Sequence, residues 1–544
     1  MSWKLKEKID SVLSKEQGTV YKEPGGKINI AFVYPNTYHV GMSNLGFQGI
    51  YGLLNKMDDV LCERVFLPDD EDMEEFLRTD TGLFAMESKR TLSRFDIIAF
   101  SVSFENDYPN IVKILTLSRI PLRSSERNST YPLVILGGAC AFFNPEPVAD
   151  FFDIVFIGEA EELLPEFLDA YRHSAERPDI LKRSVAIEGL YVPQFYSAYY
   201  DNEGKISGRY SSEGAPEIVK RRYLKDITKS DIQTSIITPE TEFSSMYLIE
   251  AMRGCPWSCR FCVAGHIYNP FRKKALQALE KEIATALSKT KRIGIIGPSL
   301  SDYPGIKEVL KIPEVDFSIT SLRASPKSAE LVGLLKGHKS ISIAPEAGTE
   351  RLRRVINKKI TEEDILRTAD LILSEGIATL RLYFMVGLPT ETREDITGIV
   401  NLVKKIKNII SKGNLTLSIS TFVPKPFTPF QWHPMEKPAE VKERLKMIKD
   451  GLLPFKGINV FHDVPKYAYM QGLFSQGDRR LSKVIEKTPE CNDWRKAAAT
   501  AGIKEEFYIF REKEFSEILP WDFIDIGVRK ENLWTEYQEA LSNH

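Results

Sequence analysis

The sequence predicts an α/β protein with two successive parallel-sheet units, and three observations support this fold class. Apolar runs of strand length alternate with helical stretches through residues 26–175, and again through residues 241–455. Between these regions, residues 176–240 have the composition of a β-hairpin connector. The chain has 544 residues, and at about 150 residues per domain this length allows three or four separate cores. We therefore expect five regions, at 1–25, 26–175, 176–240, 241–455 and 456–544.

Charge and cysteine usage narrow the class of protein. The chain carries 73 basic and 75 acidic residues and a formal net charge of −2, so it lacks the basic surface that binding of nucleic acid requires. No run approaches the 18 apolar residues of a membrane span, and the amino terminus lacks the apolar core of a signal peptide. Six cysteines occur without the spacing of a disulfide framework. Together these features indicate a cytoplasmic protein.

The first alternating region predicts a Rossmann-like, doubly wound parallel sheet. A short N-terminal helix in residues 1–25 precedes it, and its strands are expected at Ile28–Val33, Ile97–Phe104, Leu133–Leu136 and Ile154–Ile157. In such sheets ligands bind beyond the carboxyl ends of the strands. The polar and glycine-rich segments that follow three of the strands are therefore candidate ligand contacts: Asn36–Gly41, Ser101–Ser103 and Gly137–Gly138.

The second alternating region predicts a partial (β/α)6 TIM-type barrel. Six strands are expected near residues 246–252, 292–297, 315–321, 340–344, 378–386 and 415–423, with helices between them that are long enough to cross back. The last region, 456–544, has helical patterns and is expected to form a C-terminal α-rich cap without an assignable reaction. The aromatic and proline-rich segment 421–434 is expected to wall the barrel mouth, with core packing favoured over substrate contact for Trp432 and His433.

Three thiols within eight residues follow the first barrel strand. Cys255, Cys259 and Cys262 have the spacing Cys-x3-Cys-x2-Cys, and the intervening glycine, proline and serine predict a loop. Three thiolates on a four-iron cubane leave one iron without a protein ligand, whereas closed clusters use four cysteines. An alternative is a closed zinc site, because His266 follows Cys262 by four positions and could complete a Cys3His set.

This cysteine motif resembles the signature of the radical S-adenosylmethionine (SAM) superfamily, whose [4Fe-4S] cluster reduces bound SAM and releases a 5′-deoxyadenosyl radical. The resemblance implies that the later strand ends hold SAM. The candidate contacts that it implies are Phe261, Gly297, Arg323, Glu346 and Gly387. Three of them also have a structural explanation: Phe261 as core, Arg323 as a surface arginine, and Glu346 as a carboxylate at a helix amino terminus.

The first region resembles a cobalamin-binding domain, whose pattern is Asp-x-His-x-x-Gly, then Ser-x-Leu, then Gly-Gly. The corresponding residues here are Asn36, Tyr38, Gly41, Ser101, Ser103, Gly137 and Gly138. Tyr38 stands where the family has the histidine that coordinates cobalt, and His39 lies one residue late. The alternative is a Rossmann-like domain that packs on the barrel without binding the cofactor.

Nearly the whole chain resembles radical SAM proteins with an N-terminal cobalamin-binding-like domain. The stretches that carry this resemblance are Pro35–Gly46, Gly137–Pro147, Arg253–Cys262, Pro345–Asn357, Tyr383–Thr392, Pro426–Trp432 and Leu519–Gly527. The family implies a [4Fe-4S] cluster, SAM, cobalamin, and a reductant such as flavodoxin or ferredoxin. The resemblance leaves the substrate open, as a small molecule, a peptide or a lipid.

Three functions follow as hypotheses. The first is cobalamin-dependent methylation of an unactivated carbon, and the second is radical hydrogen abstraction or rearrangement without methyl transfer. The third is a sensor without turnover that binds zinc or cobalamin. A methylthiotransferase is disfavoured, because it would require a second set of cluster cysteines and only Cys62 and Cys140 lie in the amino-terminal third.

Overall fold

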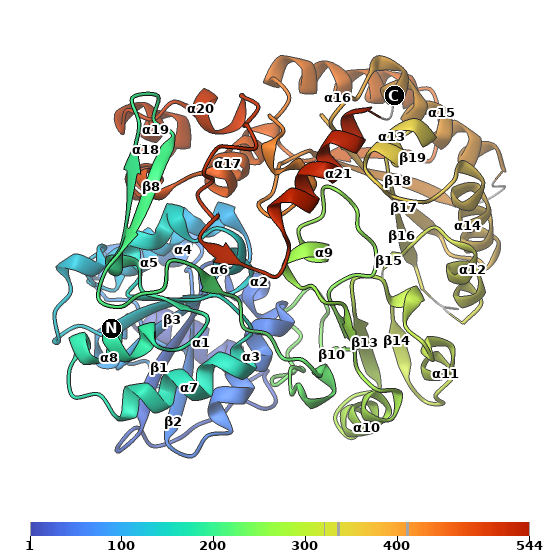
Figure 1. The fold of residues 1–544 in the computed structure, drawn as a ribbon. Coiled ribbons are helices and arrows are strands. Elements are labelled where there is room, and N and C mark those ends of the chain that lie inside the picture. Colours follow the sequence, from blue (N-terminus) through green and yellow to red (C-terminus); the bar gives the residue numbers. More distant parts are fainter. Residues whose placement is uncertain (1, 320, 335–337, 410–412, 543–544) are drawn as a thin grey trace. The chain divides into compact units, whose positions relative to one another are not determined.

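The computed structural model describes residues 2–319, 321–334, 338–409 and 413–542 (Figure 1). Its residues divide into two compact units. The sheet unit comprises Met1–Leu248, Gly477–Lys504 and Ser516–Gly527, and the barrel unit comprises Ile249–Gln476, Glu505–Phe515 and Val528–His544. The range 456–544, which the sequence predicts as one C-terminal cap, is therefore shared between the two units.

The sheet unit contains a six-stranded sheet in the order β2-β1-β3-β4-β5-β6. The strands are β1 (Ile28–Tyr34), β2 (Val60–Phe66), β3 (Ile97–Ser101), β4 (Leu133–Gly137), β5 (Ile154–Phe156) and β6 (Leu190–Tyr191). The first five are parallel, and β6 runs antiparallel to β5. The order of the first five strands is that of a doubly wound sheet, in which the winding, but not the strand direction, reverses between β1 and β3. This order confirms the predicted fold class.

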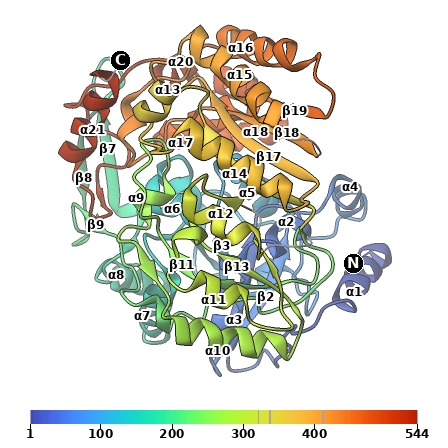
Figure 2. The same ribbon diagram turned by 90° about the vertical axis from the view of Figure 1, so that its right-hand side faces the viewer.

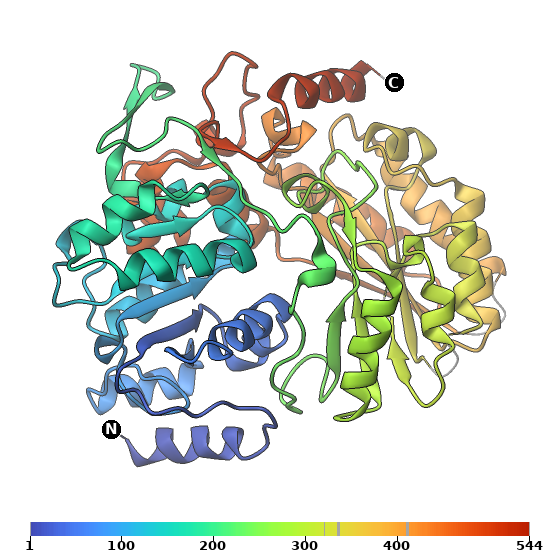
Figure 3. The same ribbon diagram turned by 60° about the horizontal axis from the view of Figure 1, so that its bottom comes forward.

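Helices flank this sheet (Figure 3). They are α1 (Trp3–Leu13), α2 (Tyr38–Met42), α3 (Leu45–Asn55), α4 (Asp70–Arg78), α5 (Tyr108–Leu117), α6 (Ala139–Phe143), α7 (Ala160–Arg172) and α8 (Arg177–Val185), with α18 (Ser482–Cys491) and α19 (Trp494–Thr500) from the C-terminal segment. Helix α1 ends at Leu13, before the predicted end of the N-terminal region. The predicted hairpin is formed by β7 (Tyr196–Tyr200) and β8 (Ile206–Ser211), and β9 (Val219–Lys220) pairs with β20 (Ile524–Asp525).

A buried ionic cluster lies in the core of the sheet unit. The Arg64 side chain on β2 is fully buried, and both of its terminal nitrogens donate to the Glu16 carboxylate at 2.7 Å. Its Nε donates to Glu87 Oε1, also at 2.7 Å. The guanidinium additionally lies 5.2 Å from the Tyr51 ring centroid. One arginine therefore balances two carboxylates that are withdrawn from water.

The barrel unit contains two main sheets, in which β13 and β14 are parallel and each neighbouring pair from β15 to β19 is parallel. The first has the order β10-β13-β14, and the second has the order β15-β16-β17-β18-β19. Their bounds are Tyr247–Glu250 (β10), Arg292–Ile296 (β13), Asp316–Ser318 (β14), Ser321–Leu322 (β15), Ser340–Glu346 (β16), Thr379–Val386 (β17), Asn414–Thr421 (β18) and Ile458–His462 (β19). The strand predicted at 315–321 corresponds to β14 and β15, and residue 320 lies outside the described residues. Strand β19 extends the sheet beyond the six predicted units.

The crossover helices lie along the outside of these strands (Figure 2). The helices of the barrel unit include α10 (Leu276–Leu287), α11 (Ile306–Leu310), α12 (Pro326–Val332), α13 (Glu350–Val355), α14 (Glu362–Ser374), α15 (Arg393–Ile409), α16 (Pro438–Leu452), α17 (Pro465–Gln476), α20 (Glu505–Ile509) and α21 (Lys530–Ser542). Helix α14 begins at a capping box, in which Thr361 and Asp364 satisfy each other's backbone amides. Such caps fix where each helix starts, and thus where the loops at the strand ends lie.

Candidate functional site

The three cysteines lie in a loop that a short antiparallel ladder closes at its base. Strand β11 (Met252–Arg253) pairs with β12 (Arg272–Lys273), so residues 254–271 leave and return at one place. Gly254 begins the loop at φ +76°, and a Cβ atom there would lie 2.5 Å from the Tyr268 carbonyl oxygen. Only glycine fits this position without displacing backbone. The glycine that precedes the first cysteine is therefore required by the shape of the loop.

Hydrogen bonds from other strand ends hold the cysteine loop. The Trp257 indole N–H donates to Asp302 Oδ2 at 2.7 Å, and the Asn357 amide donates to the Ser258 carbonyl at 2.8 Å. Arg260 follows Cys259 directly and is buried. Its guanidinium donates to the Val355 carbonyl and pairs with two carboxylates of α21, Glu536 at 2.8 Å and Glu539 at 3.2 Å. The loop is thus tied to the second and fourth strand ends and to the C-terminal helix.

The cysteine side chains are partly withdrawn from water. Cys259 is buried, and Cys255 and Cys262 are half-buried. Burial raises the pKa of the Cys255 thiol, and it raises that of Cys262 to about 11. Because thiolates are the ligands that metals take, a bound cation would have to offset this cost. Within the described residues, no three His, Cys, Asp or Glu side chains converge with the geometry of a metal site.

His266, the fourth ligand of the zinc alternative, lies on the short helix α9 (Ala264–Ile267). Its Nε2 atom is buried and has no hydrogen-bond partner among the described residues. Burial lowers the pKa of His266 to about 4, although a hydrogen bond to the Cys259 backbone opposes the shift. The imidazole is therefore neutral at neutral pH, so its protonation state is compatible with the zinc hypothesis.

Arg323 and Glu346, two predicted SAM contacts, meet at the segment that follows α13. Arg323 donates to the carbonyl oxygens of Lys358 and Lys359, and its guanidinium lies 3.8 Å from the Trp257 ring centroid. Glu346 has a positive φ of 67° and pairs with the Lys358 ammonium at 2.9 Å. Both side chains thus lie in the network that holds the cysteine loop, and Arg323 already has partners there.

Two of the other predicted SAM positions show why their residue types are needed. A Cβ atom on Gly297 would lie 2.4 Å from the Met252 side chain, so this glycine is required for packing. Gly387 has φ +82°, and its amide donates to Glu391 Oε2 at 2.7 Å. Phe261 is half-buried beside Cys262. The sequence did not single out Glu391, although it lies within the Gly387-Leu-Pro-Thr-Glu391 stretch.

We expect Glu391→Gln to remove most of a pH dependence of stability. Burial raises the pKa of Glu391 to about 7, although Arg444 and the Gly387 amide oppose the shift. Between pH 4.5 and 7 the unfolded chain releases this proton first, so the folded state loses up to about 3 kcal/mol as pH rises. Urea unfolding of the full chain at pH 5 and pH 8, followed by amide hydrogen exchange of β17, measures this loss in the barrel unit. An equal loss in the Gln variant would contradict the assignment.

In the sheet unit, small polar side chains gather at the carboxyl ends of β1 and β3. The Asn36 amide donates to Asp107 Oδ1 at 2.7 Å, and the Asn44 amide donates to Ser103 Oγ at 3.3 Å. Burial raises the pKa of Asp107 to about 6. These ends flank the point where the winding of the sheet reverses, which is where such sheets bind ligands. Asn44 and Asp107 were not predicted from sequence, although each stands at the start of a helix.

The remaining residues of the predicted cobalamin pattern have packing roles. A Cβ atom on Gly138, which has φ +94°, would lie 2.5 Å from the Val102 carbonyl oxygen, and one on Gly41 would lie 2.4 Å from the Phe66 ring. Gly137 ends β4, and Ser101 is buried at the end of β3. Tyr38 lies against Phe66, and its hydroxyl donates to Glu16 at 2.5 Å. Burial raises the pKa of Tyr38, so the phenol stays protonated.

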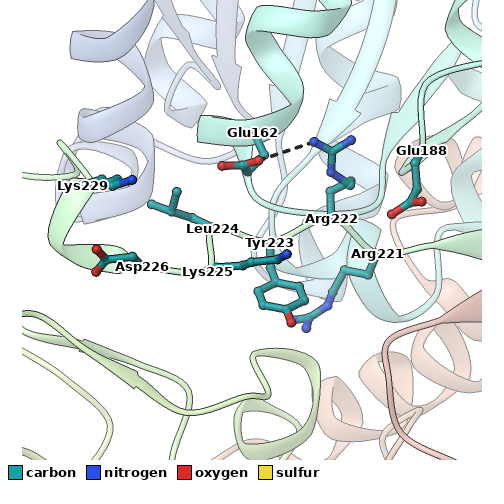
Figure 4. Close-up of a pocket in the computed structure, with 9 residues that line it drawn as sticks. All are labelled: Glu162, Glu188, Arg221, Arg222, Tyr223, Leu224, Lys225, Asp226 and Lys229. Atoms are coloured by element: carbon teal, nitrogen blue, oxygen red, sulfur yellow. Dashed lines mark hydrogen bonds and ion pairs between the residues drawn. The ribbon is translucent and has the colours of Figure 1, made fainter.

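One further cavity of about 510 Å³ lies in the sheet unit (Figure 4). Its lining comes from α7, Glu188 and the segment 221–229. Two of its lining residues, Arg222 and Glu162, form an ion pair at 3.4 Å. The lining carries basic and acidic side chains in similar numbers and includes none of the predicted site residues. Over the described part of the chain, no helix is both long and apolar enough to span a membrane.

Comparison with known proteins agrees with this arrangement. Residues 46–193 match the family described as radical SAM proteins, N-terminal, and residues 249–403 match the radical SAM superfamily. An uncharacterised protein of Methanocaldococcus jannaschii is 32% identical over 466 residues, which span 84% of this chain and 90% of that one. The ribosomal protein uS12 methylthiotransferase RimO of Clostridioides difficile is 24% identical over 50% of this chain and 64% of its own length.

Two solved structures share the fold. The radical SAM methyltransferase TsrM from Kitasatospora setae, solved with cobalamin and a [4Fe-4S] cluster, has a TM-score of 0.53 and 12% identity, covering 87% of this chain and all of that chain. The cobalamin-dependent SAM radical enzyme OxsB, with aqua-cobalamin bound, has a TM-score of 0.50 and 14% identity, covering 95% of this chain and 80% of that chain. The cysteine loop, the order of the strands and these matches together place the chain in the radical SAM superfamily, in one family with the archaeal protein.

Proposed function

We propose that this radical SAM enzyme uses cobalamin to methylate an unactivated carbon of its substrate. The observation that carries the proposal is the polar cradle at the β1 and β3 ends, where Asn36, Asn44, Ser103 and Asp107 lie at the reversal point of the sheet. TsrM and OxsB, which have the same fold, are cobalamin proteins. In this reaction the cluster supplies the electron that cleaves SAM, and the corrinoid supplies the methyl group.

A corrinoid would be held here through hydrogen-bonding side chains, since Tyr38 stands at the position of the family's histidine. The Tyr38 hydroxyl is held by Glu16 and stays protonated, which makes it a poor ligand. His39 is exposed and lies 3.6 Å from Glu242. Asn36 and Ser103 would instead offer hydrogen bonds to the edge of the macrocycle. For the cluster, Cys255, Cys259 and Cys262 are the donors, and the open iron would take SAM near Glu346 and Gly387.

A methylthiotransferase is the second candidate, because RimO and the tRNA-2-methylthio-N(6)-dimethylallyladenosine synthase of Ehrlichia canis are 24% and 25% identical to parts of this chain. The cysteines disfavour it. Cys62 lies on β2 and Cys140 lies on α6, both fully buried in the sheet unit. They cannot supply the second set of cluster ligands that such an enzyme requires. Radical hydrogen abstraction without methyl transfer remains the alternative within the same chemistry.

Anaerobic preparation followed by iron and corrinoid assays tests the proposal. We expect one corrinoid per chain, and both S-adenosylhomocysteine and 5′-deoxyadenosine from SAM with a low-potential reductant such as flavodoxin or ferredoxin. Absence of corrinoid after reconstitution would rule out methylation by this route, while 5′-deoxyadenosine alone would favour hydrogen abstraction. A cytoplasmic location, which we also propose, would supply that reductant.

We expect Ser103→Trp to lose corrinoid while keeping the iron. Ser103 is half-buried at the end of β3, and an indole there would fill the cradle. The cysteine loop belongs to the barrel unit, so the cluster should not change. Corrinoid and iron contents of the variant are measured side by side, with Ser103→Ala as the control that retains both. Full corrinoid binding by the Trp variant would place the cofactor elsewhere.

A further inference from the structure

Three side chains of the barrel unit form one hydrogen-bonded chain. His433 follows the 3-10 helix η8 (Pro429–Trp432), Tyr537 lies on α21, and Glu512 lies in the segment between α20 and α21. The Tyr537 hydroxyl donates to Glu512 Oε1 at 2.6 Å, and His433 Nδ1 lies 3.0 Å from the same hydroxyl oxygen. Tyr537 is fully buried, and its ring packs beside those of Phe430 and Trp432.

This hydrogen-bonded chain fixes the tautomer of His433. A phenol carries one hydrogen, and the 2.6 Å separation places that hydrogen in a charge-assisted bond to Glu512. The Tyr537 oxygen can then only accept a hydrogen bond from the imidazole. His433 must therefore carry its hydrogen on Nδ1, which leaves the lone pair on Nε2. Burial raises the pKa of Tyr537 above its ordinary value, so the phenol keeps its hydrogen.

The His433 ring is otherwise held by apolar contacts. The ring centroids of Phe422 and Phe430 lie 6.4 and 6.5 Å from that of the imidazole. Burial lowers the pKa of His433 to about 4; Glu512 and Glu436 oppose this shift and Lys513 adds to it, so the ring is neutral at neutral pH. Tyr537 is the one hydrogen-bond partner of the imidazole ring among the described residues. His433 is half-buried, whereas the Trp432 indole nitrogen is buried and has no partner among these residues.

The hydrogen-bonded chain of His433, Tyr537 and Glu512 lies at the strand ends where parallel barrels carry out their chemistry. Phe422 follows β18, and its amide donates to the Val386 carbonyl at the end of β17. Helix α21 connects this place to the cysteine loop, because Glu536, the neighbour of Tyr537, pairs with Arg260. A single helix therefore contacts both the cysteine loop and the His433 chain.

We propose that Nε2 of His433 is a hydrogen-bond acceptor for the substrate of the barrel site, with Tyr537 and Glu512 as its positioning residues. The substrate class that this role requires carries an N–H or O–H donor. The neutral imidazole with its hydrogen on Nδ1 offers the Nε2 lone pair, and the bond from Tyr537 to Glu512 holds that tautomer. The inference goes beyond the proposed function, since it does not depend on the corrinoid.

Nitrogen NMR of the full chain, labelled with 15N in its imidazoles, tests the tautomer. His433→Gln identifies the resonance among the seven histidines. We expect Nδ1 to be protonated and Nε2 to be unprotonated between pH 6 and 8. In Tyr537→Phe, which keeps the ring but removes the acceptor, we expect loss of this preference. A wild-type protein with its hydrogen on Nε2 would overturn the proposal, and so would a Phe variant with an unchanged tautomer.

Chemical modification tests whether Nε2 can be reached. Diethyl pyrocarbonate acylates neutral, accessible imidazoles, and peptide mass spectrometry of the cluster-loaded protein reports each histidine separately. We expect acylation at His433 and protection at His266, whose Nε2 is buried. An unreactive His433 would make the residue part of a packed wall and overturn the proposal. Absence of iron or of SAM cleavage in the unmodified protein would instead count against the family assignment. Failure of the family assignment and failure of the His433 proposal are therefore distinguishable.

Discussion

Replacement of Cys255, Cys259 and Cys262 together by Ala is expected to reduce bound iron from about four atoms per chain to none. The broad absorption near 400 nm and the formation of 5′-deoxyadenosine from SAM should disappear with it. The physical reason is that the loop between β11 and β12 carries the three proposed thiolate ligands, and without thiolates the cubane would not be held. The sheet unit should stay folded, since its core contains none of these residues. Iron analysis and circular dichroism of the anaerobic protein measure both effects.

Cys491→Ala is the matched control, because this free cysteine lies at the end of α18 in the sheet unit. It should keep the iron and the cleavage of SAM. Iron retained by the triple variant would mean that the ligands lie elsewhere. Iron lost equally from both variants would indicate general instability and would also contradict the ligand assignment.

Arg64→Ala is expected to destabilise the sheet unit by about 3–5 kcal/mol, the usual cost of removing one partner from a buried ion pair. Glu16 and Glu87 would then remain in the core without their cation. Because the chain has two compact units, a single two-state unfolding free energy is not well defined. Amide hydrogen exchange of β1 and β2 measures the sheet unit by itself.

Arg119→Ala provides the comparison, since Arg119 forms an exposed pair with Asp80. Its effect should stay within about 0.5 kcal/mol, as for most surface pairs. Similar exchange rates in the two variants would show that the Arg64 cluster does not stabilise the core.

The sequence predicts the two α/β units and the loop nature of the cysteine motif, because hydrophobic periodicity and glycine placement are local signals. In strand β2 the apolar run is interrupted by Glu63 and Arg64, and only tertiary partners satisfy these charges. Strand β19 is a short edge strand whose positions alternate between half-buried and exposed, so its signal is weak. Neither strand is among those predicted from the sequence.

Some predicted cofactor contacts already have protein partners in the structure, and these partners are distant in sequence. Arg323 is predicted to meet SAM, but in the structure it packs on Trp257 and donates to backbone carbonyls. Tyr38 lies in the cobalamin pattern, yet its hydroxyl is held by Glu16. The pair between Arg260 and Glu536 spans 276 residues, and no spacing rule predicts it. The motif indicated which residues gather at the strand ends, and the tertiary structure determines which of them already have partners.

Electron paramagnetic resonance of the reduced, anaerobically prepared protein, recorded with and without SAM, tests the central claim most directly. Three cysteine ligands leave one iron open, so we predict a [4Fe-4S]+ signal whose g values change when SAM is added. A protein that contains one zinc per chain and no iron would contradict the account, as would a cluster signal that SAM leaves unchanged.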